Sequence, residues 1–173
     1  RGYRAEVYEA RYRGQPIALK VYSRACQERC RRRLGVSAAQ FECTRNTEFY
    51  HRAELRPYVA KPVGTWLECD GWTECFAQEL LTGTTLRNLI ASTGTIPSAL
   101  ARSVCDLCHK AWAEGLYDLD LQFGNIAVID RDGEWIPKLF DFNLIPRNLT
   151  FPRPLQFLAS LTGNAFFTWR DRR

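Results

Sequence analysis

Two acidic side chains and one amide stand out in this 173-residue chain as groups that could hold a metal ion. Asp120 and Asn125 lie just after a helical pattern that stops at Gly115. Asp141 directly follows the apolar Phe140, at the far end of an expected hairpin. Oxygen ligands that converge in this way suit Mg²⁺, which proteins bind with a few groups plus substrate phosphates. A further carboxylate nearby could orient or deprotonate a hydroxyl nucleophile.

A lysine interrupts an otherwise apolar strand pattern near the start of the chain. Lys20 is the one charged residue of the stretch Ile17–Tyr22. An ammonium group buried in such a strand loses its hydration and therefore needs a partner. A solvent-facing position on an edge strand is the alternative.

Hydrophobic periodicity predicts the elements that must position these groups. Strands are expected at Val7–Ala10, Pro16–Tyr22, Lys61–Leu67 and Cys75–Leu81, and a hairpin at Ile126–Ile129 and Trp135–Phe140. Helices are expected at Thr44–Leu55, after Thr85, and from Pro97 to Glu114. The Arg-rich stretch Ser23–Ala39 is predicted to be a loop or a poorly packed helix. The pattern predicts an α+β fold, with a sheet lobe at residues 1–81 and a helical lobe at residues 82–173.

The composition favours a folded chain without a membrane span. Hydrophobic residues make up 46% of the sequence, which is enough for a core and argues against wholesale disorder. No apolar stretch approaches the roughly 20 residues that a transmembrane helix needs. The N-terminal residues show no secretory signal, although the chain starts at Arg1 rather than Met, so a segment upstream stays open.

The basic residues are concentrated locally. The formal net charge is +5, and five arginines gather between Arg24 and Arg33. Such a cluster forms either a solvated basic face or a docking surface for an acidic partner, phosphate-bearing ligand or anionic membrane. We expect no nucleic-acid partner.

The seven cysteines argue against a complete secreted disulfide framework, because their number is odd. The spacings Cys26-x-x-x-Cys30 and Cys105-x-x-Cys108 also occur among zinc ligands. Cys105 and Cys108, however, lie in a helical pattern, and buried thiols on one helix face explain them more simply. We therefore expect reduced thiols and a cytoplasmic protein.

The motifs, taken together, resemble those of protein kinases. Asp120–Asn125 has the Asp-x-x-x-x-Asn spacing of the kinase catalytic loop, and Asp141-Phe142-Asn143 resembles the Asp-Phe-Gly metal motif. Ile17–Lys20 resembles the Val-Ala-Ile-Lys strand. Arg1–Val7 is similar to the tail of a glycine-rich loop, and Glu79–Leu86 to the hinge and the helix after it. The five elements occur in kinase order over residues 1 to about 145.

This resemblance implies ATP and Mg²⁺ as cofactors and assigns roles to individual residues. Lys20 would anchor the α and β phosphates, and a helix glutamate would hold it; Glu48 is the choice, with Glu42 and Glu54 as alternatives. Asp120 would be the catalytic base, unless the nearby Asp118 takes that role. Asn125 and Asp141 would bind Mg²⁺. The residues expected at the nucleotide are Gly2, Ala5, Val7, Ala18, Lys20, Glu79, Leu80 and Leu81.

The sequence also departs from the kinase pattern. Asp118-Leu119 replaces the His-Arg that precedes the catalytic Asp, which removes the arginine that would dock a phosphorylated activation loop. Asn143 replaces the glycine of the metal motif, and 32 residues follow Asp141, with no Ala-Pro-Glu among them. A helical lobe this reduced resembles the minimal kinases that bacteria deliver into host cells as effectors, and also the kinases of lipopolysaccharide core sugars.

The expected function is phosphorylation of a partner protein, at Ser or Thr in preference to Tyr, by a monomeric kinase. A small-molecule or glycan kinase is the first alternative. The second is a pseudokinase that serves as a binding module without using nucleotide. These classes share one fold and one ATP site, so the motifs alone do not separate them.

Overall fold

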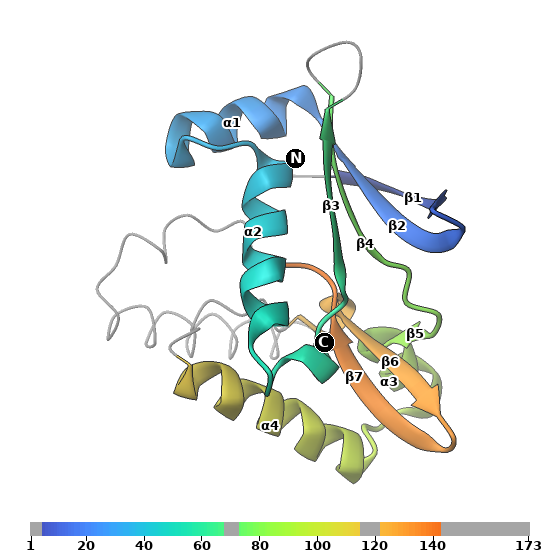
Figure 1. The fold of residues 1–173 in the computed structure, drawn as a ribbon. Coiled ribbons are helices and arrows are strands. Elements are labelled where there is room, and N and C mark those ends of the chain that lie inside the picture. Colours follow the sequence, from blue (N-terminus) through green and yellow to red (C-terminus); the bar gives the residue numbers. More distant parts are fainter. Residues whose placement is uncertain (1–4, 68–72, 115–121, 143–173) are drawn as a thin grey trace.

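The computed structural model describes residues 5–67, 73–114 and 122–142. Their ribbon has an antiparallel sheet on one side and a mainly helical part on the other, with one long helix running alongside both (Figure 1). We call this sheet, with the two helices that lie between its second and third strands in sequence, the sheet lobe, and the remainder the helical lobe. A lobe boundary at residue 81 stays a prediction.

The sheet lobe contains four antiparallel strands in the order β1-β2-β4-β3. Their bounds are β1 Ala5–Tyr12, β2 Gln15–Tyr22, β3 Pro62–Leu67 and β4 Glu74–Glu79, so all four expected strands are confirmed with small shifts at their ends. The tight turn between β1 and β2 has positive φ at Arg13 (50°) and Gly14 (79°), the conformation that twisted hairpins favour. The core strand β2 places Lys20 opposite Phe76 of β4.

Two helices, α1 (Arg24–Leu34) and α2 (Ala38–His51), connect β2 to β3. The helix expected at Thr44–Leu55 therefore starts six residues earlier and ends four residues earlier than predicted. Its start is fixed by a capping box. The Ser37 hydroxyl accepts from the backbone N–H of Gln40, and the Gln40 side chain accepts from the backbone N–H of Ser37. The stretch predicted as a loop or a loose helix is largely α1, which buries Cys26, Gln27 and Cys30.

The helical lobe contains α3 (Leu86–Thr93) and α4 (Ser98–Ala113), both close to their expected positions. A second antiparallel sheet has the order β5-β6-β7, with β5 Thr84–Thr85, β6 Ile126–Arg131 and β7 Glu134–Leu139. Short 3₁₀ turns, η1 (Arg56–Tyr58) and η2 (Phe123–Asn125), precede β3 and β6. The expected hairpin is confirmed, with positive φ at Asp132 and Gly133 in its turn.

One hydrophobic cluster joins the two lobes. Phe49 of α2 and the following Leu55 and Val59 are almost completely buried. They pack in the same cluster as buried residues of the helical lobe, namely Leu86, Leu89, Leu100, Leu107, Ala111, Ile126, Val128, Leu139 and Phe142. The backbone of Ala60 also donates to Leu139 O (2.9 Å). The end of α2 is therefore anchored in the helical lobe, while its start packs against α1 and the sheet.

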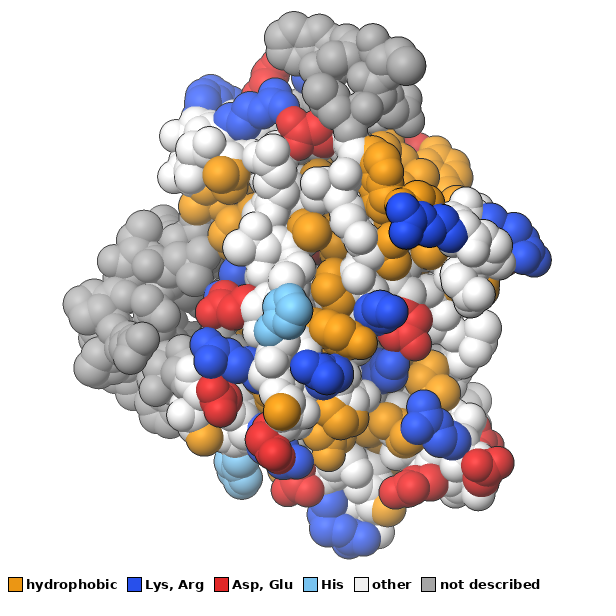
Figure 2. Space-filling model, viewed as in Figure 1, with side chains coloured by type: hydrophobic (Ala, Val, Ile, Leu, Met, Phe, Trp, Pro, Cys, Tyr) orange, Lys and Arg blue, Asp and Glu red, His pale blue; other side chains and the backbone are white. Residues whose placement is uncertain are grey.

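None of the described helices is both long and apolar enough to cross a membrane. On the face shown in Figure 2, basic and acidic side chains are interspersed over the helical lobe. Within α1, Arg24 pairs with Glu28, and Arg31 with Glu74 at the start of β4. Part of the predicted basic cluster is thus neutralised by its own neighbours.

Candidate active site

Lys20 is the most deeply buried basic residue of the site. Only 5% of it is exposed, because β2 is an interior strand of the sheet. Its ammonium forms an ion pair with Glu42 of α2 and donates to the backbone oxygen of Phe140 (2.7 Å). Asp141 Oδ1 lies 3.4 Å from the same nitrogen. The expectation that Lys20 has a buried anionic partner is confirmed.

The prediction that Glu48 is this partner is wrong, and the alternative Glu42 is right. Six residues on an α-helix correspond to a rotation of about 240°, so Glu42 and Glu48 face different directions. Glu48 instead pairs with Arg45 on the same helix. Glu54 lies beyond the end of α2, 3.4 Å from Lys110 of α4. The error arose because α2 was predicted to begin at Thr44, which placed Glu42 outside the helix.

Burial and charge act together on this ion pair. Burial would lower the pKa of the Lys20 ammonium, but the carboxylates of Glu42 and Asp141 outweigh it and raise that pKa. Burial raises the pKa of Glu42, against the opposing effect of Lys20. The phenol of Tyr22 donates to Glu42. Burial raises the pKa of Tyr22 well above its usual range, and the negative charge of Glu42 raises it further. Lys20 therefore stays cationic, and Tyr22 stays a hydrogen-bond donor.

The peptide groups of Phe140 connect the two residues expected to bind the metal. The Phe140 N–H donates to the backbone oxygen of Asn125 (3.3 Å), and its carbonyl accepts from Lys20 and from Gln78 Nε2 (2.7 Å each). Asp141 follows directly, with about half of its side chain exposed. The β6–β7 hairpin thus holds the backbone of Asn125 against the residue that precedes Asp141, and Asp141 lies beside Lys20.

A cavity of about 190 Å³ lies between the sheet lobe and β5–β6. Five of the residues expected at the nucleotide line it: Val7, Ala18, Glu79, Leu80 and Leu81. Gln78, Gly83 and Phe140 also contribute to its walls. The cavity is therefore continuous with the carbonyl that Lys20 binds. An adenine ring fits a mainly apolar slot of this kind, flanked by backbone groups.

A glycine allows the segment after β4 to approach β6 closely at this cavity. A Cβ atom at Gly83 would lie 2.4 Å from the backbone oxygen of Val128 in β6. Any side chain at this position would push the segment after β4 away from β6. Next to it, the Glu79 carboxylate bridges the lobes by accepting from Lys138 of β7 at 2.9 and 3.0 Å.

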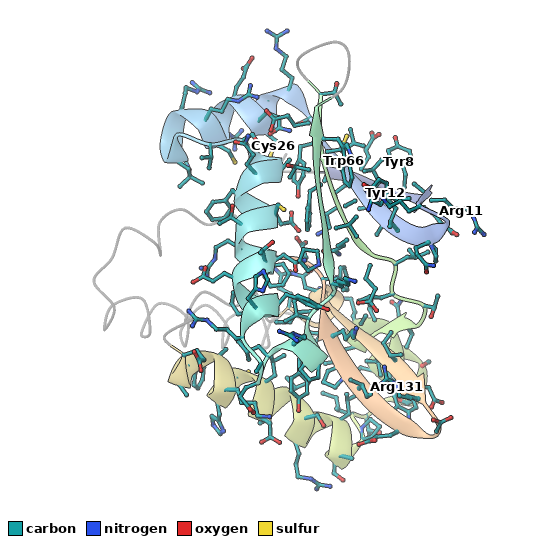
Figure 3. All side chains as sticks on the ribbon, viewed as in Figure 1. Tyr8, Arg11, Tyr12, Cys26, Trp66 and Arg131 are labelled. Atoms are coloured by element: carbon teal, nitrogen blue, oxygen red, sulfur yellow. The ribbon has the colours of Figure 1, made fainter. Side chains whose placement is uncertain are left out.

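A second, larger cavity of about 460 Å³ lies at the β1–β2 turn and the start of β3. Its walls include Tyr12, Pro16, Pro62 and Glu79, but neither Lys20 nor Asp141. The Tyr12 ring also contacts Trp66 at a centroid distance of 5.3 Å, on the part of the sheet lobe labelled in Figure 3. The one carboxylate among its lining residues, Glu79, is paired with Lys138, so the size of this cavity does not make it the site.

Several expected site residues lie outside the described residues: Gly2, Asp118, Asp120 and Asn143. Ala5 is described at the start of β1, away from the lining of the smaller cavity. Sequence reasoning did not single out Tyr22, Asn46 or Gln78, which complete the hydrogen bonds around Lys20 and Phe140. Gln78 carries the one signal that could have indicated it in the sequence, because it is a polar residue in an apolar strand pattern, as Lys20 is.

The donors present fit Mg²⁺ bound together with phosphates better than a metal bound by protein alone. Among residues 5–67, 73–114 and 122–142, no three His, Cys, Asp or Glu side chains are grouped closely enough to hold a metal ion. Asp141 offers one half-exposed carboxylate beside a lysine. Mg²⁺ in nucleotide sites is typically bound by one or two carboxylates, with phosphates and water completing its shell.

No protein-family model and no curated protein matches the sequence. Solved structures do match. A Rad53 fragment in complex with AMP-PNP superposes with a TM-score of 0.64 at 19% identity, over 90% of this chain and 40% of that one. The kinase domain of Mycobacterium tuberculosis PknI gives a TM-score of 0.53 at 23% identity, over 80% of this chain and 54% of that domain. A doubly substituted form of that domain gives 0.57 at 24% identity.

The chain thus spans 40% to 54% of the length of these neighbours. Identities at this level define the fold alone. Two lobes, a buried lysine paired with a helix glutamate, and a cavity between the lobes are all in place. The chain has the two-lobed, α+β protein-kinase-like fold.

Proposed function

We propose that this protein is an ATP-dependent phosphotransferase that phosphorylates Ser or Thr hydroxyls of a partner protein. The observation that carries the proposal is the meeting of Lys20, Glu42 and Asp141 at the carbonyl of Phe140, on the wall of the smaller cavity. Burying a lysine with two acidic neighbours costs desolvation free energy. Such an arrangement is expected where the site needs charge for its function.

In the proposed complex, the adenine occupies the smaller cavity, between Val7 and Ala18 on one side and Leu80 and Leu81 on the other. Lys20 is held in place by Glu42 and turns its ammonium toward the α and β phosphates. Asp141 and Asn125 hold Mg²⁺, which neutralises charge on the phosphates. Asp120 accepts the proton of the substrate hydroxyl. Phosphoryl transfer depends mainly on positioning and charge stabilisation, so this short set of groups suffices.

Two finer proposals follow from the surface and the thiols. The described cysteines form no disulfide with one another, which supports action in a reducing compartment such as the cytosol of the producing cell or of a host. Arg29, Arg32 and Arg33 of α1 add to a basic surface that we propose as the docking site of an acidic partner. Charge reversal at Arg32 should then weaken partner binding most at low ionic strength. Unchanged binding in low salt would remove this docking site.

The test of the main proposal is transfer of label from γ-labelled ATP, with Mg²⁺, to a panel of proteins, sugars and lipids. Wild type is compared with Lys20→Met, Asp120→Ala and Asp141→Ala. Label should appear on protein. Each substitution should reduce it by several orders of magnitude, because each removes a charged side chain that is proposed to position or stabilise the reacting groups. Glu48→Gln is the control and should retain activity, since Glu48 pairs with Arg45 away from Lys20.

Other outcomes distinguish the competing functions. Transfer to a sugar or lipid alone would make the protein a small-molecule kinase. A binding module that does not use nucleotide would show no transfer, and no rise in melting temperature with ATP and Mg²⁺. A ligand that binds only the folded state stabilises it by an amount that grows with the ratio of ligand concentration to Kd. Equal labelling by wild type and all three site variants would show that the assigned residues are wrong.

A further inference from the structure

Two buried amide side chains form a second connection between α2 and the Phe140 carbonyl. Asn46 is completely buried on α2, one turn after Glu42, and Gln78 is 2% exposed on β4. Asn46 Nδ2 donates to Gln78 Oε1 (3.0 Å), and Gln78 Nε2 donates to the oxygen of Phe140 (2.7 Å). We call Asn46 and Gln78 the amide pair.

The direction of these hydrogen bonds is fixed by chemistry. A carbonyl oxygen only accepts, so Gln78 must turn its NH₂ group toward Phe140. Its own oxygen then faces Asn46, which in turn must donate. Both polar ends of Gln78 are used in this way, and Gln78 also lines the smaller cavity.

Helix α2 therefore reaches one backbone oxygen by two routes. Glu42 acts through Lys20, and Asn46 acts through Gln78, from positions four residues apart that share one helix face. The carbonyl has two lone pairs, and both are occupied. Since the N–H of Phe140 binds Asn125, the peptide groups on both sides of Phe140 are held, and with them the backbone position of Asp141.

Simple core packing does not explain the amide pair. Buried amides lose hydration, and apolar side chains of similar size would fill the same space without that loss. The pair is not even fully satisfied, since Asn46 Oδ1 has no hydrogen-bond partner among the described residues. Polar groups retained at this cost need a role that packing alone does not supply.

We propose that Asn46 and Gln78 are positioning residues that hold the backbone before Asp141 in the orientation required for binding Mg²⁺ and phosphate. This inference rests on the proposed nucleotide site. It makes the position of α2 and the metal-binding residue interdependent through a path that does not use the Lys20–Glu42 ion pair.

The experiment uses Asn46→Leu, Gln78→Leu and the double variant, which keep the approximate size of both side chains. The first measurement is hydrogen exchange of the peptide that covers Leu139–Phe142, without ligand. Gln78→Leu should speed exchange of the Phe140 amide about tenfold, the effect of losing one buried hydrogen bond. Asn46→Leu should act less, because it acts through Gln78, and the double variant should match Gln78→Leu.

The second measurement is the rise in melting temperature with ATP, in the presence and absence of Mg²⁺. The Mg²⁺-dependent part should be lost in Gln78→Leu and reduced in Asn46→Leu. Asn46 is not among the residues that line the cavity, so the Mg²⁺-independent part should remain in Asn46→Leu. The matched control is Leu100→Ala, which removes a buried side chain of α4 and lowers stability without touching the amide pair. Its Mg²⁺-dependent part should be retained.

The outcomes separate this inference from the proposed function. The positioning role alone would be overturned if Gln78→Leu shows the same Mg²⁺-dependent rise in melting temperature as the wild type and the same hydrogen exchange at Phe140. The absence of any nucleotide response in the wild type would contradict the proposed function, and the positioning role with it. Loss of the Mg²⁺-dependent part in Gln78→Leu but not in Leu100→Ala supports the inference.

Discussion

Lys20 and Glu42 show how strongly the site depends on single buried charges. Lys20→Met would leave the Glu42 carboxylate buried without its cation, which typically costs about 3 kcal/mol of the free energy of unfolding. The double variant Lys20→Met/Glu42→Met should lose much less than the sum of the two single changes, because it leaves no uncompensated charge. Urea unfolding of the four proteins measures the difference.

The control for this cycle is Glu48, which the sequence placed in the role of Glu42. Its partner Arg45 is on the same helix and its side chain is about a third exposed, so Glu48→Gln should change stability by less than about 1 kcal/mol. A loss as large as that of Glu42→Met would contradict the observed pairing. Additive losses in the Lys20 and Glu42 cycle would mean that the two charges do not interact.

The cysteines of α4 give a residue-scale prediction about reactivity. Burial, with a smaller effect of Cys105, raises the pKa of the Cys108 thiol to about 12. Alkylation needs the thiolate, so at pH 8 Cys108 should react far more slowly than a free thiol, and its rate should rise about tenfold per pH unit up to that pKa. Mass spectrometry after iodoacetamide treatment follows the site, with Cys105→Ser to remove its neighbour. Rapid labelling at pH 8 would show an accessible, acidic thiol of the kind that binds zinc.

At the scale of elements, the sequence predicted the strands well and the region between β2 and β3 poorly. Strands such as β2 carry their own signal, because apolar residues are continuous where a strand is buried. The helices α1 and α2 begin at serine caps, Ser23 and Ser37, and Gly35 separates them, but the arginines of α1 hide its buried face. The sequence therefore predicts, in place of two adjacent helices, a loop or poorly packed helix followed by one displaced helix, and the choice of Glu48 over Glu42 follows from that shift.

The segment after β4 gives a prediction about the spacing between elements. Gly83→Ala should lower stability by about 2 kcal/mol or more, because the added Cβ meets the backbone of Val128 and cannot be accommodated by a side-chain rotation. It should also weaken ATP binding, since Gly83 lines the smaller cavity. Thermal unfolding with and without ATP reports both effects.

Gly94, which ends α3, is the matched control for this substitution. It has a positive φ of 75° and open space around it, so Gly94→Ala should cost about 1 kcal/mol through backbone strain alone. Its response to ATP should be that of the wild type. Equal losses of ATP binding in the two variants would show that the close approach of Gly83 to β6 is unimportant for the cavity.

At the scale of the whole molecule, the site is made by contacts that are distant in sequence. The carbonyl of Phe140 accepts from both Lys20 and Gln78, although up to 120 residues separate the partners in sequence. Local patterns cannot predict such a meeting, because it depends on the strand order β1-β2-β4-β3 and on how the β6–β7 hairpin packs beneath it. The kinase-like motif order supplied the missing information for Lys20 and Asp141. It supplied none for Asn46 and Gln78, whose roles are specific to this chain's packing.

The shared hydrophobic cluster leads to the prediction that both lobes unfold together. Leu55 is fully buried where the end of α2 meets the helical lobe, so Leu55→Ala should cost about 3 kcal/mol through the cavity it leaves. Urea unfolding should remain a single transition that coincides by far-ultraviolet circular dichroism and by tryptophan fluorescence. Tryptophans of both lobes contribute to that fluorescence, among them Trp66 in β3, Trp112 in α4 and Trp135 in β7. Val36→Ala, at an exposed position, should change the midpoint little. Two separate transitions in Leu55→Ala would mean that the sheet lobe keeps its fold without the helical lobe. The proposed coupling between α2 and Asp141 would then be local rather than a property of the whole core.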